Sequence, residues 1–142
     1  DISDPGNLGT IIRNCSWFGI KNILLSENCA ELYNPKVIRS TMGAIFHLNI
    51  FEYINFKMLA PKIKSHEYNF IIADMDGDNL YQFKPKQKSI VFFCNEANGP
   101  SSDLLEIADK KITIPKVGKV ESLNVANACG IILSEFIRKK FN

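Results

Sequence analysis

The sequence predicts an α/β fold in which a mostly parallel sheet is flanked by helices. Strand-like apolar segments alternate with segments of helical periodicity along the whole chain, an order typical of parallel sheets. Residues 89–94 form a continuous apolar run, which suits a strand buried on both faces of such a sheet. At 142 residues, the chain has the length of a single domain with one sizeable core.

The first half of the chain is predicted to contain two helices and two strands. Residues 4–7 have the composition of a turn, and Gly19 and Gly43 each follow an apolar periodic segment at the position of a helix C-cap. Pro35 suits the first position of a helix, where its missing N–H costs nothing. The predicted helices are residues 8–18 and 35–42, and the predicted strands are residues 22–26 and 48–51.

The second half is predicted to contain three strands and three helices. Ser101 or Ser102 can cap a short helix, and an amphipathic helix runs from Ser122 to the end of the chain. The predicted strands are residues 69–73, 89–94 and 111–114, and the other predicted helices are residues 56–65 and 103–108.

Three segments rich in small or polar residues follow predicted strands: residues 74–78, 95–102 and 115–124. Ligands of open α/β sheets bind beyond the carboxyl ends of the strands. We therefore expect the functional site where these three loops converge.

Composition and short motifs exclude several classes of protein. No apolar run reaches the roughly 18 residues of a membrane span, and the first residues do not resemble a signal peptide. The four scattered cysteines form no C-x-x-C pair, so we interpret them as reduced thiols in or near a core, which suits a cytoplasmic protein. Asp74, Asp76 and Asp78 lack the downstream glutamate of a calcium loop, and we interpret them as turn formers rather than metal ligands.

Charge is distributed in local basic clusters, although the net charge is only +2. A single cluster usually forms a solvated surface, but several on one face could neutralise RNA phosphates. The clusters are residues 84–88, Lys110 with Lys111, Lys116 with Lys119, and residues 138–140.

Two charged residues attract attention by their positions alone. Arg13 lies among apolar residues of the first predicted helix, and an arginine so close to a core usually has a partner. Glu96 follows a buried strand directly, where it can cap a helix, bond backbone amides or serve a site; the structural role is favoured. Phosphate-binding and dinucleotide-binding glycine motifs are absent.

Three segments, in order and suitably spaced, resemble the motifs of the SpoU/TrmH branch of the SPOUT methyltransferases. They are residues 4–13 with Phe18-Gly19, residues 90–96 with Gly99, and residues 112–115 followed by Gly118 and residues 121–128. Residues 35–46 between them also fit. The resemblance covers essentially the whole chain, and it implies a C-terminal deep trefoil knot, S-adenosylmethionine as cofactor, no metal, and a homodimer.

The resemblance also implies roles for individual residues. Arg13 would orient the target 2′-hydroxyl and stabilise its oxygen, because a guanidinium is a poor base. Asn7 and Glu96 would position Arg13, and Asn124 would hold the knot or contact RNA. Backbone groups at strand ends would bind the cofactor, at Ala73, Cys94, Gly99, Ile114, Ser122 and Leu123. The family commonly has glycine where this chain has Cys94, and a backbone contact then requires the cysteine side chain to point away from the ligand.

The expected function is methylation of a ribose 2′-hydroxyl in RNA, with ribosomal RNA favoured because residues 4–9 and 39–44 look most like ribosomal-type members. Alternatives are a transfer RNA 2′-O-methyltransferase, a non-catalytic RNA-binding relative of the same fold and, more remotely, a Rossmann-type oxidoreductase. The chain opens at a functional-looking loop, so we expect a first strand and an N-terminal RNA-binding extension upstream of residues 1–142.

Overall fold

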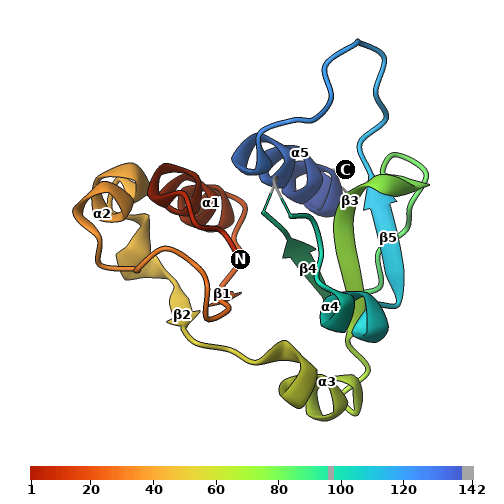
Figure 1. Ribbon diagram of the computed structural model, residues 1–142, viewed down its shortest axis with the longest axis horizontal. Coiled ribbons are helices and arrows are strands. Elements are labelled where there is room, and N and C mark those ends of the chain that lie inside the picture. The colour runs from red at the N-terminus through yellow and green to blue at the C-terminus, as the bar shows by residue number, and fades with distance from the viewer. Residues whose placement is uncertain (96–97, 139–142) are drawn as a thin grey trace. The chain divides into compact units, whose positions relative to one another are not determined.

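The computed structural model describes residues 1–95 and 98–138, and the chain forms two compact units (Figure 1). The terminal unit consists of Asp1–Ile54 and Asn124–Asn142, and the central unit consists of Asn55–Leu123. The two ends of the sequence therefore fold together, while the middle of the chain forms a unit of its own.

The terminal unit combines three α-helices with a short parallel sheet. Its two strands pair in register, Ile23 opposite Ile50. The elements are α1 (Pro5–Trp17), β1 (Asn22–Leu24), α2 (Pro35–Thr41), the 3-10 helix η1 (Ala44–His47), β2 (Asn49–Phe51) and α5 (Val125–Ile137).

Helix α1 begins earlier than the sequence pattern suggested. Residues 4–7, expected as a turn, are the N-cap and first turn of this helix: Asp4 accepts a hydrogen bond from the backbone N–H of Asn7 at 2.7 Å, and Pro5 occupies the first position. The composition of a turn and that of a capped helix start overlap, because both use aspartate and proline. Gly19 follows the C-cap with φ +73°, as expected.

Helix α1 packs against both α2 and α5. Gly9 brings α1 and α2 close together, since a Cβ at this position would lie 2.5 Å from Ser40 Cβ and 2.7 Å from the Val37 carbonyl oxygen. The apolar stripe predicted for the last helix is buried on α5, at Val125, Ala126, Cys129, Ile132, Leu133 and Ile137.

The central unit is built on a three-stranded parallel sheet in the order β4-β3-β5. Ala73 of β3 lies opposite Phe93, the last residue of β4, and opposite Ile112 of β5. The elements are α3 (Phe56–Lys64), β3 (Asn69–Asn79), β4 (Ser89–Phe93), α4 (Ser102–Ile107, capped by Ser101) and β5 (Lys110–Thr113).

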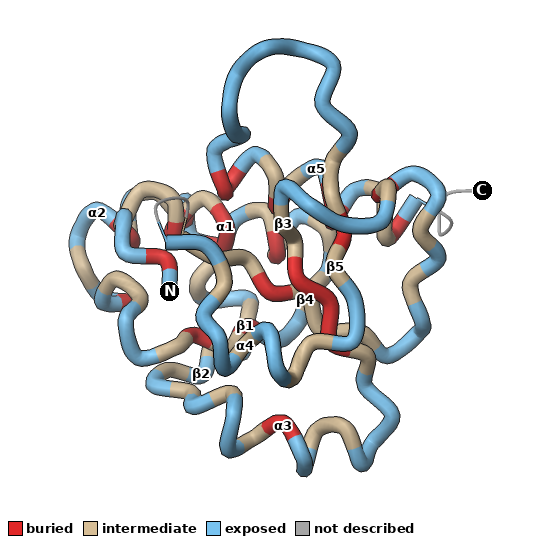
Figure 2. Tube along the Cα trace, turned by 45° about the vertical axis from the view of Figure 1, so that its right-hand side comes forward, coloured by how far each residue is buried: buried red, intermediate tan, exposed pale blue. Residues whose placement is uncertain are grey.

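The core of the central unit lies on one face of this sheet, and Figure 2 shows the buried residues along β3. Phe70, Ile72 and Phe92 pack there with Ala60 of α3, and Leu104 and Ile107 bring α4 onto the same cluster. The Phe56 and Phe92 rings meet edge to face, with centroids 5.1 Å apart. Helices α3 and α4 therefore cover one face of the sheet.

The prediction of a loop at residues 74–78 is wrong. These residues belong to strand β3, which continues to Asn79. The pairing register with β5 shifts between Ala73 and Asp78, both of which lie opposite Ile112, so the residues between them form a bulge. At Gly77 a Cβ would lie only 2.6 Å from the Lys111 carbonyl carbon, which explains a glycine here. The aspartates Asp74 and Asp78 belong to this bulged strand rather than to a free turn.

All strand pairings among residues 1–95 and 98–138 are parallel, and they form two sheets rather than one. All four cysteines are free thiols; Cys15 and Cys129 are buried, and Cys29 and Cys94 are partly buried. In the described part of the chain, no helix combines the length and apolarity needed to cross a membrane.

Candidate functional site

Three of the predicted cofactor residues lie in or directly after the three neighbouring strands of the central sheet. Ala73 lies in β3, Cys94 directly follows β4, and Ile114 directly follows β5. The register places Ala73 opposite Phe93, the residue before Cys94, and opposite Ile112, two residues before Ile114. All three predicted cofactor residues are partly buried, so this part of the sheet offers backbone groups among apolar side chains, the surroundings that suit a flat heterocycle with a polar rim.

The side chain of Cys94 points into the core. It packs against the cluster of Phe70, Ile72 and Phe92, on the side covered by α3 and α4. Burial raises the pKa of the Cys94 thiol, so the side chain is a neutral apolar group at physiological pH. A cysteine in place of the usual glycine therefore leaves the backbone of residue 94 available at the sheet edge.

The loop after β4 turns at Gly99. This glycine has φ +62°, a conformation that other residues rarely adopt, and its N–H donates to the Asn95 carbonyl at 2.9 Å. The predicted catalytic residue Glu96 and the neighbouring Ala97 lie outside the described residues.

The other two predicted cofactor residues lie on the long segment that follows β5. Ser122 and Leu123 are both exposed, Leu123 by 44%, and neither forms a hydrogen bond within the described part of the chain. In Figure 1 this segment extends well beyond the end of β5 before α5 begins. The cofactor contacts of Ser122 and Leu123 stay a prediction.

An ion pair at the same sheet edge was not foreseen from the sequence. Asp74, next to Ala73, accepts a hydrogen bond from Lys111 Nζ at 2.7 Å. Burial opposes ionisation, but the hydrogen bonds from Lys111 and from the Met75 N–H bring the pKa of Asp74 below its ordinary value. The sequence does contain the basic partner, in Lys110-Lys111. The ion pair could be predicted only if the strand order, which places β5 beside β3, were known.

The terminal unit links two of the predicted catalytic residues. Asn124 Nδ2 donates to Asn7 Oδ1 at 2.9 Å, although the two residues are 117 positions apart in the sequence. Asn124 is also the N-cap of α5, because its Oδ1 accepts from the backbone N–H groups of Ala126 and Asn127 at 3.0 and 3.4 Å. This bond joins the first turn of α1 to the start of α5.

Arg13 is exposed on α1. Within residues 1–95 and 98–138, its guanidinium forms no hydrogen bond or ion pair. The partner expected from its apolar neighbourhood is thus absent from this part of the chain, and Asn7 bonds Asn124 rather than Arg13. Five donors of fixed geometry are left available on Arg13.

Asn14 is a structural residue that the sequence pattern did not reveal. Its Nδ2 donates to the Ala126 carbonyl at 2.8 Å, and its amide lies against Gly130, where a Cβ would be 3.3 Å from Nδ2. Asn14 therefore fixes α1, which carries Arg13, against the first turns of α5. An amide inside the apolar periodicity of residues 8–18 was the available clue.

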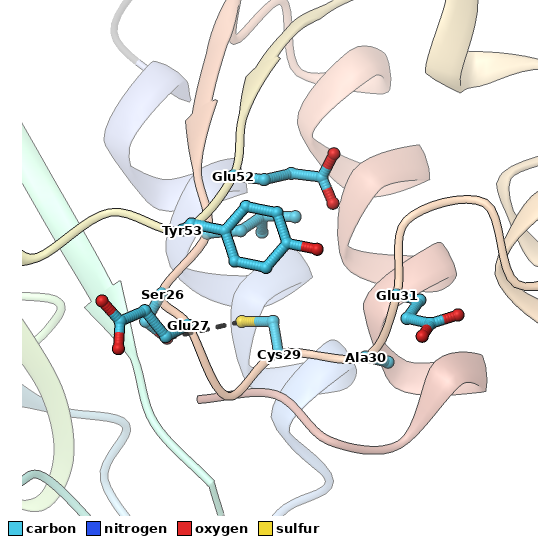
Figure 3. A pocket seen from close by; sticks show the side chains of 8 residues that line it. Ser26, Glu27, Cys29, Ala30, Glu31, Glu52 and Tyr53 are labelled. Atoms are coloured by element: carbon cyan, nitrogen blue, oxygen red, sulfur yellow. Dashed lines mark hydrogen bonds between the residues drawn. The ribbon is translucent and has the colours of Figure 1, made fainter.

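The terminal unit also contains a pocket lined by eight residues (Figure 3). Tyr53 and Cys29 face its interior, and the carboxylates of Glu27, Glu31 and Glu52 surround it. The lining includes none of the predicted site residues, and its three carboxylates repel a phosphate backbone. The chemistry predicted from the sequence therefore does not belong to this pocket.

Metal ligands do not cluster in the described residues, where no group of three His, Cys, Asp or Glu side chains is arranged to hold an ion.

The sequence profile of the SpoU rRNA methylase family matches residues 1–134. The chain belongs to this family. An uncharacterized tRNA/rRNA methyltransferase of Synechocystis is 33% identical to this SpoU-family chain over 99% of the chain and 52% of the relative. The 23S rRNA (guanosine(2553)-2′-O)-methyltransferase RlmP of Bacillus subtilis is 32% identical over 93% of the chain and 53% of the relative.

Solved structures share the fold of this SpoU-family chain. The SpoU methyltransferase AviRb of Streptomyces viridochromogenes, crystallised with the cofactor AdoMet, superposes with a TM-score of 0.91 at 27% identity. The match covers 99% of this chain and 58% of AviRb. The chain spans about half the length of the curated relatives named above.

Proposed function

We propose that this chain is the catalytic domain of an enzyme that uses S-adenosylmethionine to methylate a ribose 2′-hydroxyl in RNA. The observation that carries the proposal is the placement of Ala73, Cys94 and Ile114 in or directly after three neighbouring parallel strands, with the Cys94 side chain turned into the core. Family membership supports it, as do the relative that methylates 23S rRNA and the AdoMet complex of AviRb.

The central unit is assigned to the methyl donor. Backbone groups of Ala73, Cys94 and Ile114 would bind the adenine edge, and Gly99 would let the loop after β4 approach closely. Ser122 and Leu123 would close over the bound molecule. When bound, S-adenosylmethionine supplies an activated methyl group, so the chemistry requires no metal.

The terminal unit is assigned to the acceptor. The exposed Arg13 would bind the RNA at the target ribose and stabilise negative charge on its 2′-oxygen. The bond between Asn124 and Asn7, together with the bond from Asn14 to Ala126, fixes the helix that carries Arg13. Glu96 would complete this set as a positioning residue.

Ribosomal RNA is the substrate we favour, because one of the named relatives methylates 23S rRNA at a 2′-hydroxyl. Transfer RNA is the alternative, since the name of the Synechocystis relative covers both classes. We further propose a homodimer, a C-terminal deep trefoil knot, and a cytoplasmic location. A non-catalytic RNA-binding protein of the same fold is the second candidate, which the retained Arg13 argues against.

The deciding experiment separates donor binding from methyl transfer. We expect Arg13→Ala in the full-length protein to lower the methylation rate by at least 100-fold, because transition-state stabilisation is lost. Calorimetric titration with S-adenosylmethionine should give an unchanged Kd for the same variant. Transfer is measured as incorporation of labelled methyl into total RNA from cells lacking the gene.

Arg138→Ala is the matched control, since among residues 1–95 and 98–138 the Arg138 side chain pairs only with Glu135, at the end of α5. This variant should methylate RNA like the wild type. Equal rates for wild type and Arg13→Ala would refute the catalytic assignment, and a wild-type protein that binds RNA but no S-adenosylmethionine would favour the non-catalytic alternative.

A further inference from the structure

A basic surface lies at the amino ends of β3 and β4, opposite the carboxyl edge that carries the candidate cofactor residues. Five lysines from two segments contribute to it: Lys62, Lys64, Lys84, Lys86 and Lys88. We call them the lysine face. Lys62 and Lys64 end α3, and the other three precede β4.

Contacts in the structure bring these two segments together. Lys88 Nζ donates to the His66 carbonyl at 3.1 Å and lies 6.0 Å from the centre of the Tyr68 ring. The backbone N–H of Asn69 donates to the Lys88 carbonyl at 2.9 Å. Lys64 and Lys86 both act on the carboxylate of Asp109 and lower its pKa, so Lys64, Lys86 and Lys88 lie on one surface, with Lys62 and Lys84 two residues away in sequence.

Charge is concentrated on this surface. Residues 62–68 and 84–88 contain five lysines and one acidic residue, Glu67; with Asp109, the partner of Lys64, they carry three positive charges in excess. Because the whole chain carries only +2, the remainder of the chain sums to about −1. Asp109 is engaged by Lys64, whose Nζ lies 2.7 Å from its carboxylate.

Contacts within the protein explain the presence of only some of the lysines in the lysine face. Lys64 pairs with Asp109, and lysines at the end of α3 complement the negative end of the helix dipole. Lys62, Lys84 and Lys86 are exposed and make no ion pair within the described residues. Exposed lysines together with an aromatic ring, here Lys88 beside Tyr68, are typical of surfaces that bind single-stranded nucleic acid.

We propose that the lysine face binds phosphates of the substrate RNA at nucleotides flanking the methylated one. This inference rests on the proposed function and adds a second RNA contact outside the catalytic machinery. The five residues of β4 span about 16 Å at ~3.3 Å per residue, so the two edges of the sheet are a few nucleotides apart. RNA is favoured over an acidic protein because a phosphate strand neutralises a row of lysines without requiring an apolar partner surface.

The test uses the double variant Lys84→Gln/Lys86→Gln in the full-length protein, because these exposed side chains form no ion pair within the described residues. The probe is a fluorescent 15-nucleotide single-stranded RNA of mixed sequence, titrated from 50 to 300 mM salt. Loss of two phosphate contacts should reduce the slope of log K against log salt by ~1.4 and weaken binding roughly tenfold at 150 mM salt. In methylation assays KM should rise while kcat stays unchanged, because uniform binding is lost.

The control Lys21→Gln/Lys57→Gln removes the same charge elsewhere and should keep the wild-type slope; because Lys57 pairs with Asp103 and Glu106, thermal unfolding first checks that this control is folded. An unchanged slope and KM in Lys84→Gln/Lys86→Gln, an equal loss in the control, or displacement of the RNA by polyglutamate at equal charge would each overturn the lysine face. A wild-type protein that transfers no methyl group to RNA overturns the proposed function instead, so the two failures are distinguishable.

Discussion

Asn124 performs two structural tasks with one amide group. Its oxygen caps α5, and its nitrogen holds Asn7 in the first turn of α1. The resemblance to known methyltransferases nominated both residues, but a bond across 117 positions cannot be deduced from spacing. In contrast, the capping role was accessible, because an asparagine before an apolar helical stripe is a standard helix start.

We expect Asn124→Ala to lower the free energy of unfolding by about 1–2 kcal/mol, from the lost cap and the lost bond to Asn7. Urea denaturation followed by circular dichroism measures this change. Methyl transfer should fall as well, because α1 loses an anchor close to Arg13.

Asn34→Ala provides the comparison, since Asn34 caps α2 in the same way, through the backbone N–H of Lys36 at 2.9 Å. It should cost similar stability while leaving methyl transfer largely intact. If both variants reduce methyl transfer in proportion to their stability, Asn124 has only a structural role.

At the scale of elements, the sequence predicted what local chemistry decides. The ends of α2 and α4 were located within a residue or two, because proline, serine and glycine mark helix ends through their own backbone preferences. The extension of β3 was missed, because it depends on pairing with β5 more than thirty residues later. The sequence predicted that loops at strand ends would converge. It could not predict the Asp74–Lys111 ion pair, because that pair depends on which strands are neighbours.

The close packing of Gly77 in the bulge of β3 leads to a testable prediction. Gly77→Ala should destabilise the protein by about 2 kcal/mol or more, because the added methyl group would meet the rigid backbone of Lys111 and Ile112. Gly118→Ala should be nearly neutral, since a Cβ there meets no atom within 4 Å. Thermal unfolding of both variants gives the comparison; a stable Gly77→Ala protein would show that the bulge relaxes at little cost.

For the whole molecule, the sequence predicted one domain, whereas the structure has two compact units. A single cooperative domain transmits ligand binding to every region, because binding stabilises the folded state as a whole. With S-adenosylmethionine at 100 times its Kd, this adds ~2.7 kcal/mol to the free energy of opening.

Hydrogen exchange followed by mass spectrometry tests this expectation. Peptides from α1 and from β3 should gain equal protection on addition of S-adenosylmethionine. Protection confined to β3 and its neighbours would show that the terminal and central units open independently, and that residues 1–142 are not one cooperative domain.

The terminal unit is built from the first and last segments of the chain, and this has a consequence during synthesis on the ribosome. Helix α1 packs against α5, and Asn14 reaches a carbonyl 112 residues later. At translation rates of about 5–20 residues per second, the nascent α1 waits roughly 5–20 seconds for its partner. The central unit leaves the ribosome complete in the meantime. The first helix, with Arg13 on it, is therefore exposed to chaperones and proteases longer than any other helix of the chain.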